Sequence, residues 1–348
     1  MRRRSFIALS FLAGYGVFAA GSSTPLIFGD DRKSQKNNSL FVFNQEYDIR
    51  WAEKYNALSE LIYGIPNPTP LEKFVGVKDK LLENKILRAA DLNTSAVATI
   101  DDLGEVHELD YILKTYALAC SGVGALKFDP IIPKLIEFFN SSVGGTYLAS
   151  EIALEKGAAM NLSGGFHHAF PDHDDGFCYF NDVAIAIKKL QAEKKIEKAM
   201  IVDCDVHHGN GNAYIFRKNP SVTIFDIYQE DNYPAKKVDV EFPVPLFSED
   251  EIGDERYIGE LQILPHIMRQ YNPDIIFYLA GADPYEHDKL GKFLLTKEGL
   301  AERDEFIIKN SRDLGIPIAI VTAGGYAQNP QDVIDIHYNT ARILRELF

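Results

Sequence analysis

Nine residues, 203–211, form the densest group of metal-binding side chains in the sequence. They read Asp-Cys-Asp-Val-His-His-Gly-Asn-Gly and follow the apolar, strand-like run 199–202. Because side chains alternate along a strand, Asp203, Asp205 and His207 are expected on one face of the strand and its exit. Carboxylates with an imidazole suit a divalent metal and leave room for a third ligand and a water. The alternative is an acidic strand end that caps the next helix, but two Asp and two His within six residues favour a metal site.

Apolar runs of strand length alternate with helical patterns from about residue 40 to the end. Two helical segments have recognisable starts, because Asn181 can cap one of them and Asn329-Pro330 opens the last. Strands rich in Val and Ile between helices predict an α/β fold, a single domain with an open, mostly parallel sheet and helices on both faces. The predicted strands are 40–43, 158–162, 199–203, 222–227, 275–280 and 316–322.

Such sheets bind ligands beside the carboxyl ends of their strands, so functional residues are expected directly after the strands. Ser-Gly-Gly-Phe-His-His-Ala follows at 163–169, Gly-Ala-Asp at 281–283 and Ala-Gly-Gly-Tyr at 323–326. The glycines allow the backbone to approach a ligand closely. Together with 203–211, four strand ends therefore supply two His pairs, several Asp and one Tyr to a common site.

The composition indicates a large folded domain with an acidic surface. Of 348 residues, 46% are hydrophobic, which is enough for a substantial core, and the formal net charge is −14. This charge argues against nucleic acid as a partner, since such binding depends on Lys and Arg at phosphates, and it favours cationic partners. The cysteines Cys120, Cys178 and Cys204 form no disulfide framework and are expected to be buried thiols.

The N-terminus has the pattern of a targeting signal. Three arginines at 2–4 precede an uncharged apolar run at 6–20, a pattern typical of secretory signals, and 3–7 also resembles a twin-arginine signal. We expect 1–24 to be a signal peptide or N-terminal anchor, 25–39 a polar linker and 40–348 the folded domain. The protein is then exported, to the periplasm or outside, with a buried N-terminal helix as the alternative. No other segment is expected to span a membrane.

Five segments, taken in order, resemble the zinc-dependent histone deacetylases of the arginase–deacetylase fold. They are 164–168 (Gly-Gly-Phe-His-His), 176–182 (Gly-Phe-Cys-Tyr-Phe-Asn-Asp), 203–211, 281–283 and 324–326. The resemblance runs from about Phe41 to the C-terminus. It is strongest to the class IV branch and its bacterial relatives, because of Tyr228, Tyr233-Pro234, 288–291 and 303–306.

The resemblance implies a role for each matching residue. Asp205, His207 and Asp283 correspond to the ligands of Zn²⁺, for which Fe²⁺ or Co²⁺ could substitute. Asp203 corresponds to the residue that holds His167 and helps form a site for K⁺ or Na⁺. His168 corresponds to the general base and Tyr326 to the donor that stabilises the oxyanion, and the flanking Gly324 and Gly325 let that loop change shape.

One position departs from part of the family. Asn210 stands where some relatives have an Asp that partners the general base. Without that carboxylate, His168 is expected to have a lower pKa. Other branches carry Asn there, so activity is expected to persist.

Aromatic residues are expected to line the channel to the metal. The resemblance assigns Gly176, Phe177 and Tyr233 to its wall, with core packing as the alternative for the two rings. Five histidines have no matched role and are expected at the surface or at caps, and 174–175 is expected to be a solvated acidic loop. These histidines are His107, His173, His266, His287 and His337.

The resemblance implies an amidohydrolase that removes acyl groups, acetyl or long-chain fatty acyl, from the Nε of lysine in a peptide or protein by a zinc-activated water. One alternative is an acetylpolyamine amidohydrolase, which an acidic protein would suit. A second alternative is a non-catalytic protein that binds acyl-lysine. The oligomeric state stays open.

Overall fold

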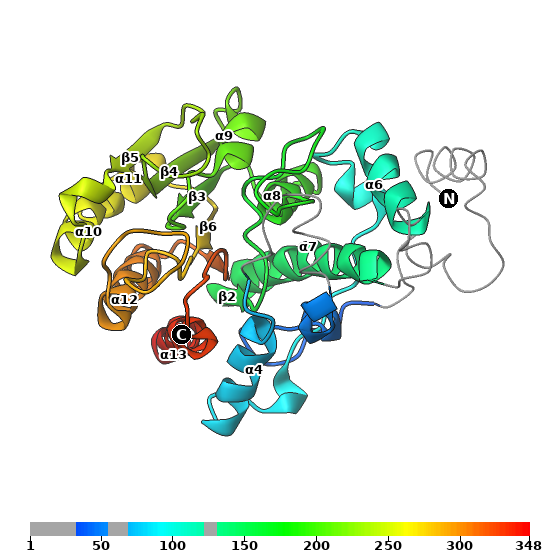
Figure 1. The fold of residues 1–348 in the computed structure, drawn as a ribbon, viewed down its shortest axis with the longest axis horizontal. Coiled ribbons are helices and arrows are strands. Elements are labelled where there is room, and N and C mark those ends of the chain that lie inside the picture. The colour runs from blue at the N-terminus through cyan, green and yellow to red at the C-terminus, as the bar shows by residue number, and fades with distance from the viewer. Residues whose placement is uncertain (1–32, 55–68, 122–130) are drawn as a thin grey trace.

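The computed structural model describes residues 33–54, 69–121 and 131–348, and the predicted signal at 1–24 and the first part of the predicted linker lie outside these ranges. Seven strands form one fully parallel sheet in the order β1-β2-β7-β6-β3-β4-β5 (Figure 1). This confirms the predicted single-domain α/β fold. The strands are β1 (Phe41–Val42), β2 (Ala158–Asn161), β3 (Ala199–Asp203), β4 (Val222–Gln229), β5 (Phe242–Leu246), β6 (Ile275–Leu279) and β7 (Ile318–Val321).

Strand β5 was absent from the strands predicted from sequence. Its sequence, Phe-Pro-Val-Pro-Leu, contains two prolines. Proline has no backbone N–H, so it cannot donate the hydrogen bonds that a strand with neighbours on both sides requires. The strand lies at the edge of the sheet and pairs with β4 alone, which is the position where proline is tolerated.

Helices cover both faces of the sheet. In Figure 1, α7 and α8 lie to the right of the strands, while α10 to α13 lie to the left and below. One face packs against α7 and α8 through Ala159, Ile201 and Phe277, and the other packs against α12 and α13 through Met200 and Ile320. The helices are α4 (Lys73–Glu83), α5 (Ile100–Leu103), α6 (Leu109–Ser121), α7 (Ile131–Lys156), α8 (Asp182–Ala192), α9 (Asn210–Phe216), α10 (Asp254–Leu261), α11 (Leu264–Tyr271), α12 (Lys297–Leu314) and α13 (Pro330–Leu347).

The two predicted helix starts are confirmed. The Asn181 side chain accepts a hydrogen bond from the Ala184 amide at the start of α8. Asn329 accepts one from the Gln331 amide, and Pro330 is the first residue of α13.

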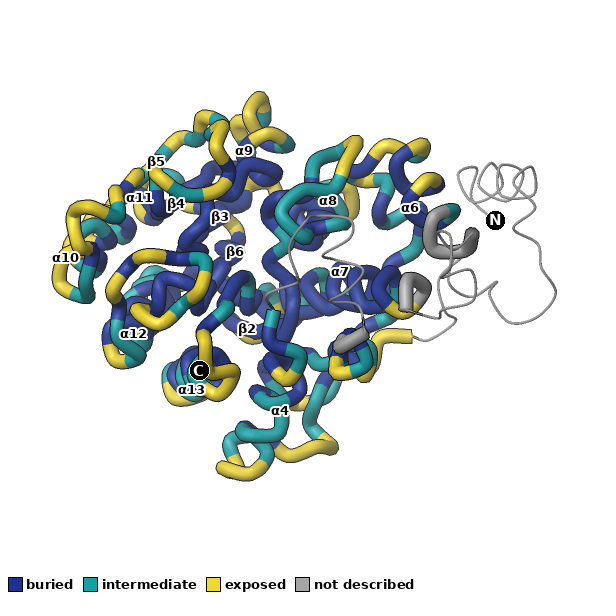
Figure 2. The backbone as a smooth tube through the Cα atoms, viewed as in Figure 1, coloured by how far each residue is buried: buried dark blue, intermediate teal, exposed yellow. Residues whose placement is uncertain are grey.

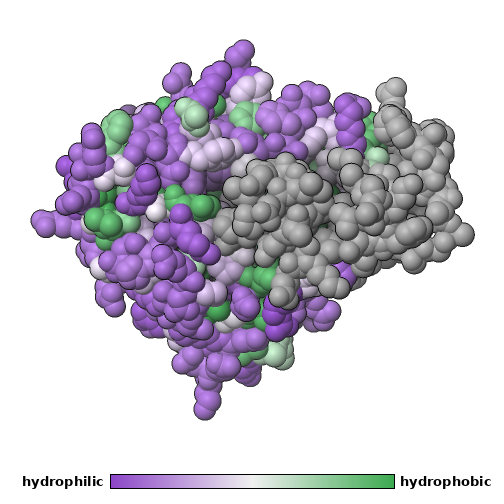
Figure 3. Space-filling view, viewed as in Figure 1, coloured by the Kyte–Doolittle hydropathy of each residue, from purple (hydrophilic) through white to green (hydrophobic). Residues whose placement is uncertain are grey.

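Burial separates an apolar interior from a polar surface. Strands β2, β3, β4, β6 and β7 are buried along their whole length. Figure 2 shows β2, β3, β4 and β6 in the colour of buried residues. The described residues visible in Figure 3 are mostly hydrophilic, which agrees with the acidic composition. Among the described helices, none has the length and apolar content needed to cross a membrane.

Candidate active site

The four strands that precede the predicted site residues are neighbours in the sheet, in the order β2-β7-β6-β3. Their carboxyl ends therefore meet at the centre of one sheet edge. His167 and His168 follow β2, Tyr326 follows β7, Asp283 follows β6, and 203–211 follows β3.

Asp205, His207 and Asp283 form the candidate metal site. All three are buried, and one potential ligand atom of each lies within 4.8 Å of the others. His207 Nδ1 lies 3.0 Å from Asp205 Oδ1 and 3.2 Å from Asp283 Oδ2. Although the Oδ2 atom of Asp283 is buried, it accepts no hydrogen bond from the residues that the structure describes. An orphaned carboxylate oxygen facing a second carboxylate and an imidazole fits a divalent cation.

The pKa shifts of Asp283 and His207 also favour a divalent cation at this site. Burial, together with the charge of Asp205, raises the pKa of Asp283 to about 7. Burial alone would lower the pKa of His207, but the two carboxylates outweigh it and raise it to about 10. Both shifts arise because two carboxylates are buried side by side, and a divalent cation would offset their negative charge.

Backbone amides hold the two carboxylates in place. Gly324 N–H donates to Asp205 Oδ2 at 2.7 Å, and Val206 N–H donates to Asp283 Oδ1 at 3.0 Å. A Cβ atom on Gly324 would lie 2.1 Å from Asp283 Oδ2, so only glycine fits there. This close approach explains the glycines that precede Tyr326.

The two histidines after β2 have different partners. His167 Nδ1 lies 2.8 Å from Asp203 Oδ2, and His168 Nδ1 lies 2.7 Å from Asn210 Oδ1. Their Nε2 atoms are 3.1 Å apart. Burial alone would lower the pKa of His167, but Asp203 and Asp205 raise it to about 9. The pKa of His168 is well below its usual value, because of burial and then of the positive charges on His167 and His207. The surroundings thus favour the charged form of His167 and the neutral form of His168.

Tyr326 lines the same two cavities as His168 and lies near the candidate metal site. Its ring centroid is 6.2 Å from that of His207. Burial and the charges of Asp205 and Asp283 raise the pKa of Tyr326 well above its usual value, so its hydroxyl stays a donor. Asp288 holds this loop by accepting the Tyr326 amide at 2.7 Å.

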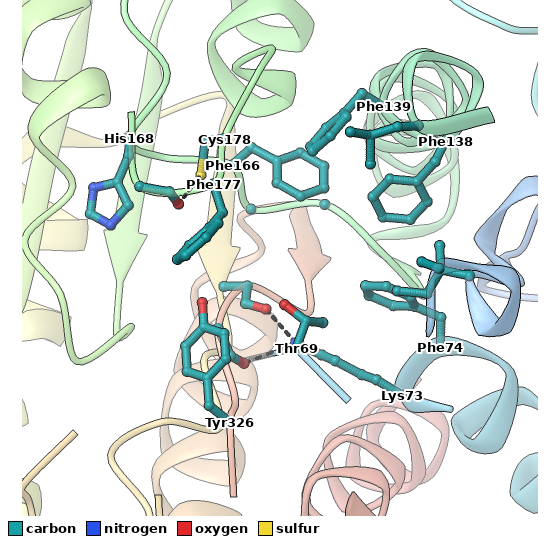
Figure 4. Close-up of a pocket in the computed structure, with 18 of the residues that line it drawn as sticks. Thr69, Lys73, Phe74, Phe138, Phe139, Phe166, His168, Phe177, Cys178 and Tyr326 are labelled. Atoms are coloured by element: carbon teal, nitrogen blue, oxygen red, sulfur yellow. Dashed lines mark hydrogen bonds between the residues drawn. The ribbon is translucent and has the colours of Figure 1, made fainter. Parts of the chain in front are cut away.

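Two cavities meet at these residues. The outer cavity, the mouth, is lined by the predicted wall residues Phe177 and Tyr233 and by Asn232 and Leu290. The inner cavity runs from the metal site to an apolar end lined by Trp51, Ala52, Leu135, Phe138 and Phe139. Figure 4 shows His168, Phe177 and Tyr326 at one end of it and Phe74, Phe138 and Phe139 at the other. His168, Gly176, Phe177 and Tyr326 line both cavities.

The backbone around Phe177 is strained. Phe177 has φ of +61°, a conformation that costs a bulky residue free energy. A Cβ on the preceding Gly176 would lie 2.2 Å from His168 Cδ2. Phe177 is only partly buried, so it lines the channel and core packing does not account for it.

Two predictions about residues outside the site need correction. His337 is buried and not at the surface, whereas His107 is buried but has the predicted capping role, since its Nε2 accepts the Asn181 amide at 3.0 Å. Asp175 is half-buried and is more than a solvated loop residue, because it accepts hydrogen bonds from Asn210 and Tyr233. Cys178 and Cys204 are buried free thiols, as predicted, and burial raises the pKa of both.

Sequence reasoning missed two buried cations that act on the backbone of the site. Lys73 donates to the carbonyls of Ala323 and Gly324 from the wall of the inner cavity. Arg303 donates to the carbonyls of Cys204 and Gly281, next to the strands that carry the candidate ligands. Neither residue has a chemical signature in the sequence, although 303–306 carried part of the resemblance.

The chain has the arginase–deacetylase fold, with a cluster of potential metal ligands at the carboxyl ends of its central strands. Residues 68–340 match the histone deacetylase domain, and the chain therefore belongs to the histone deacetylase family. It is 34% identical over 290 residues to an uncharacterized protein of Picosynechococcus sp., covering 80% of this chain and 93% of that one.

Other relatives agree with this family. Histone deacetylase 2 of Arabidopsis thaliana is 29% identical, with 84% of this chain and 76% of that protein covered. A probable deacetylase of Methanothermobacter thermautotrophicus is 30% identical, with 70% and 77% covered. The crystal structure of the HDA15 HD domain superposes with a TM-score of 0.71 at 21% identity, covering 88% and 87% of the two chains, which shows the same fold.

Proposed function

We propose that this chain removes acyl groups from the Nε of lysine residues in peptides or proteins, with Zn²⁺ held by Asp205, His207 and Asp283. The observation that carries the proposal is the position of this cluster between His168 and Tyr326, where the two cavities meet. When bound, the metal supplies Lewis acidity toward the amide carbonyl and makes water more acidic.

The side chains around the metal have complementary roles. His168 is neutral and takes the proton of the attacking water at Nε2, then delivers it to the departing lysine amine. The Tyr326 hydroxyl, kept protonated, donates to the carbonyl oxygen as negative charge develops there. His167, paired with Asp203, keeps a positive charge beside the base. Cys178 is a buried thiol that donates to the Gly176 carbonyl, and burial raises its pKa, so this thiol is a poor nucleophile beside the attacking water.

The two cavities assign the two ends of the substrate. The stem of the lysine passes between Phe177 and Tyr233 in the mouth, and the acyl group enters the inner cavity. The inner cavity has a volume of about 90 Å³. The cavity continues past the candidate metal site to an end lined by Trp51, Leu135, Phe138 and Phe139, so an apolar acyl chain longer than acetyl has apolar surface to contact there.

A chain-length series tests this proposal. Zinc-loaded protein is given one lysine peptide that bears acetyl, octanoyl or myristoyl, and the longer chains are expected to have a higher kcat/KM than acetyl. Ala52→Phe fills the far end of the inner cavity, so it is expected to abolish this preference and keep acetyl turnover. Equal loss of all three substrates would mean that the tail does not occupy this cavity. No turnover of any peptide would refute the proposal.

Acetylpolyamine hydrolysis is the second candidate. Asp174 and Asp175 line the mouth, and the chain carries a net charge of −14, both of which favour a cationic substrate. Acetylputrescine run beside the peptides decides between the two. A non-catalytic acyl-lysine binder would instead hold the peptide without hydrolysing it.

We further propose a monovalent cation, K⁺ or Na⁺, beside Asp203. Its support is Asp226, which pairs with Asp203 across β3 and β4 and whose buried Oδ1 has no partner among the described residues. Flame photometry of dialysed protein, with Asp226→Asn as the comparison, tests this site.

Assignment to class IV and export through the N-terminal signal also remain proposals. Residues 1–39, signal and linker together, fused to a reporter that is active only outside the cytoplasm, would test the export. A reporter that stays inactive would refute it.

A further inference from the structure

A chain of hydrogen bonds runs from the mouth of the channel to His168. His168 Nδ1 lies 2.7 Å from Asn210 Oδ1, and Asn210 Nδ2 donates to Asp175 Oδ2 at 2.9 Å. The other oxygen of Asp175 accepts the Gly176 amide at 3.0 Å and the Tyr233 hydroxyl. Both carboxylate oxygens of Asp175 are therefore engaged, one toward the base and one toward the channel wall.

We propose that Asp175 is a positioning residue that fixes the tautomer of His168 through the Asn210 amide. This inference rests on the proposed function, in which His168 is the base. Some relatives have an Asp at position 210 in direct contact with the base. In this chain the carboxylate is that of Asp175, which reaches His168 through Asn210.

The Asn210 side chain ends in an oxygen that accepts hydrogen bonds and an NH₂ group that donates them. An Asn side chain can present either its oxygen or its NH₂ group to a neighbour, and the two orientations have nearly the same shape. An ionised carboxylate only accepts hydrogen bonds, so Asp175 admits only the NH₂ end of Asn210. The oxygen of Asn210 then faces His168. The Gly211 amide, 3.1 Å from the same oxygen, supports this orientation.

The orientation of Asn210 decides where the His168 proton lies. An amide oxygen accepts, so Nδ1 of His168 carries the hydrogen, and Nε2 keeps a lone pair. This Nε2 lies 3.1 Å from His167 Nε2, and the His168 ring centroid lies 6.0 Å from that of His207, one of the candidate metal ligands. A flipped Asn210 would instead place the proton on Nε2, where His168 cannot act as a base.

Tyr233 connects the hydrogen-bonded chain of His168, Asn210 and Asp175 to the wall of the channel. Its ring lies edge-on to His168, with centroids 5.0 Å apart and an interplanar angle of 84°. Its hydroxyl donates to Asp175 Oδ1, so the wall that contacts the lysine stem also holds the carboxylate that orients the base.

Asp175→Asn tests the inference, because an amide at 175 no longer forces the orientation of Asn210. We expect kcat on the best acyl-lysine peptide to fall about tenfold, with little change in KM. Asp175→Asn combined with Asn210→Asp returns a carboxylate directly to His168 Nδ1 and is expected to recover most of the lost kcat. Asp172→Asn is the matched control, since Asp172 is an exposed acid of the same loop that pairs with His173.

A readout independent of turnover separates this inference from the proposed function. The ¹⁵N shifts of His168, assigned with His168→Gln, are expected to report Nδ1–H in the wild type and a mixture of tautomers in Asp175→Asn. A kcat within twofold of wild type and unchanged shifts in Asp175→Asn would overturn the inference, as would a double variant no better than the single one. If the wild type hydrolyses no peptide, the proposed function fails, while the nitrogen shifts still decide the role of Asp175.

Discussion

Arg303 offers a sharp test of how the site is supported. The guanidinium and its partner Asp304 are fully buried, with Arg303 Nη2 2.8 Å and Nε 2.9 Å from Asp304 Oδ1. Arg303 Nη1 also donates to the Gly281 carbonyl at 2.7 Å and the Cys204 carbonyl at 3.2 Å. Arg303→Met leaves a buried carboxylate without its cation, which costs about 3–5 kcal/mol. With a urea m-value of about 3 kcal/mol per molar, the unfolding midpoint should fall by more than about 1 M.

A matched control lies on the same helix. Arg312 also pairs with the next residue, Asp313, at 2.9 Å, but both side chains are more than one third exposed. Arg312→Met should leave the midpoint unchanged, because exposed pairs are screened by solvent. The assay is urea unfolding followed by circular dichroism, with zinc affinity measured by chelator competition. Equal midpoints for the two variants would refute the reasoning, and unchanged zinc affinity in Arg303→Met would show that its carbonyl contacts do not hold the ligands in place.

Three further predictions concern the site itself. Tyr326→Phe should lower kcat by about 10²–10³-fold, or about 3–4 kcal/mol, while zinc content measured by elemental analysis stays the same, because only the donor is lost. Asp283→Asn should lower bound zinc well below one equivalent, since a ligand charge is removed, and a full equivalent would contradict the proposed ligand set. Asn210→Asp places a carboxylate on His168 and raises its pKa from the lowered value, so the acidic limb of the pH–rate profile should move to higher pH. A limb that moves down, or stays, would contradict His168 as the base.

The fold could be predicted because its signals are local. The buried strands β3 and β6 are short apolar runs, and their predicted bounds agree with the structure within one residue. Strand β5 could not be found in this way, since Pro243 and Pro245 argue against a strand unless its edge position is known. The order of the strands in the sheet could not be predicted from the sequence either. Strands β3 and β6 are neighbours in the sheet although β4 and β5 lie between them along the chain.

The site divides into residues recognisable by type and residues recognisable only by their partners. Asp205 and His207 could be singled out because carboxylate and imidazole at a strand end suggest metal chemistry. Asp283 could be assigned as the third metal ligand only by the family resemblance, and the structure brings it into the same cluster. Asp175 reads as one more acid in a polar loop until its two oxygens are traced to Asn210 and Tyr233.

The roles of Lys73 and Arg303 could not be predicted from the sequence either. A lysine or arginine in a helix predicts an exposed charge, yet both are almost completely buried and donate to main-chain carbonyls. Main-chain carbonyls carry no sequence identity, so no pattern in the chain marks their partners. Each cation lies beside a segment that holds a carboxylate ligand or the tyrosine donor, where its charge also offsets the buried acids. Residues that react can therefore be found by their type, while residues that hold them must be found by what they contact.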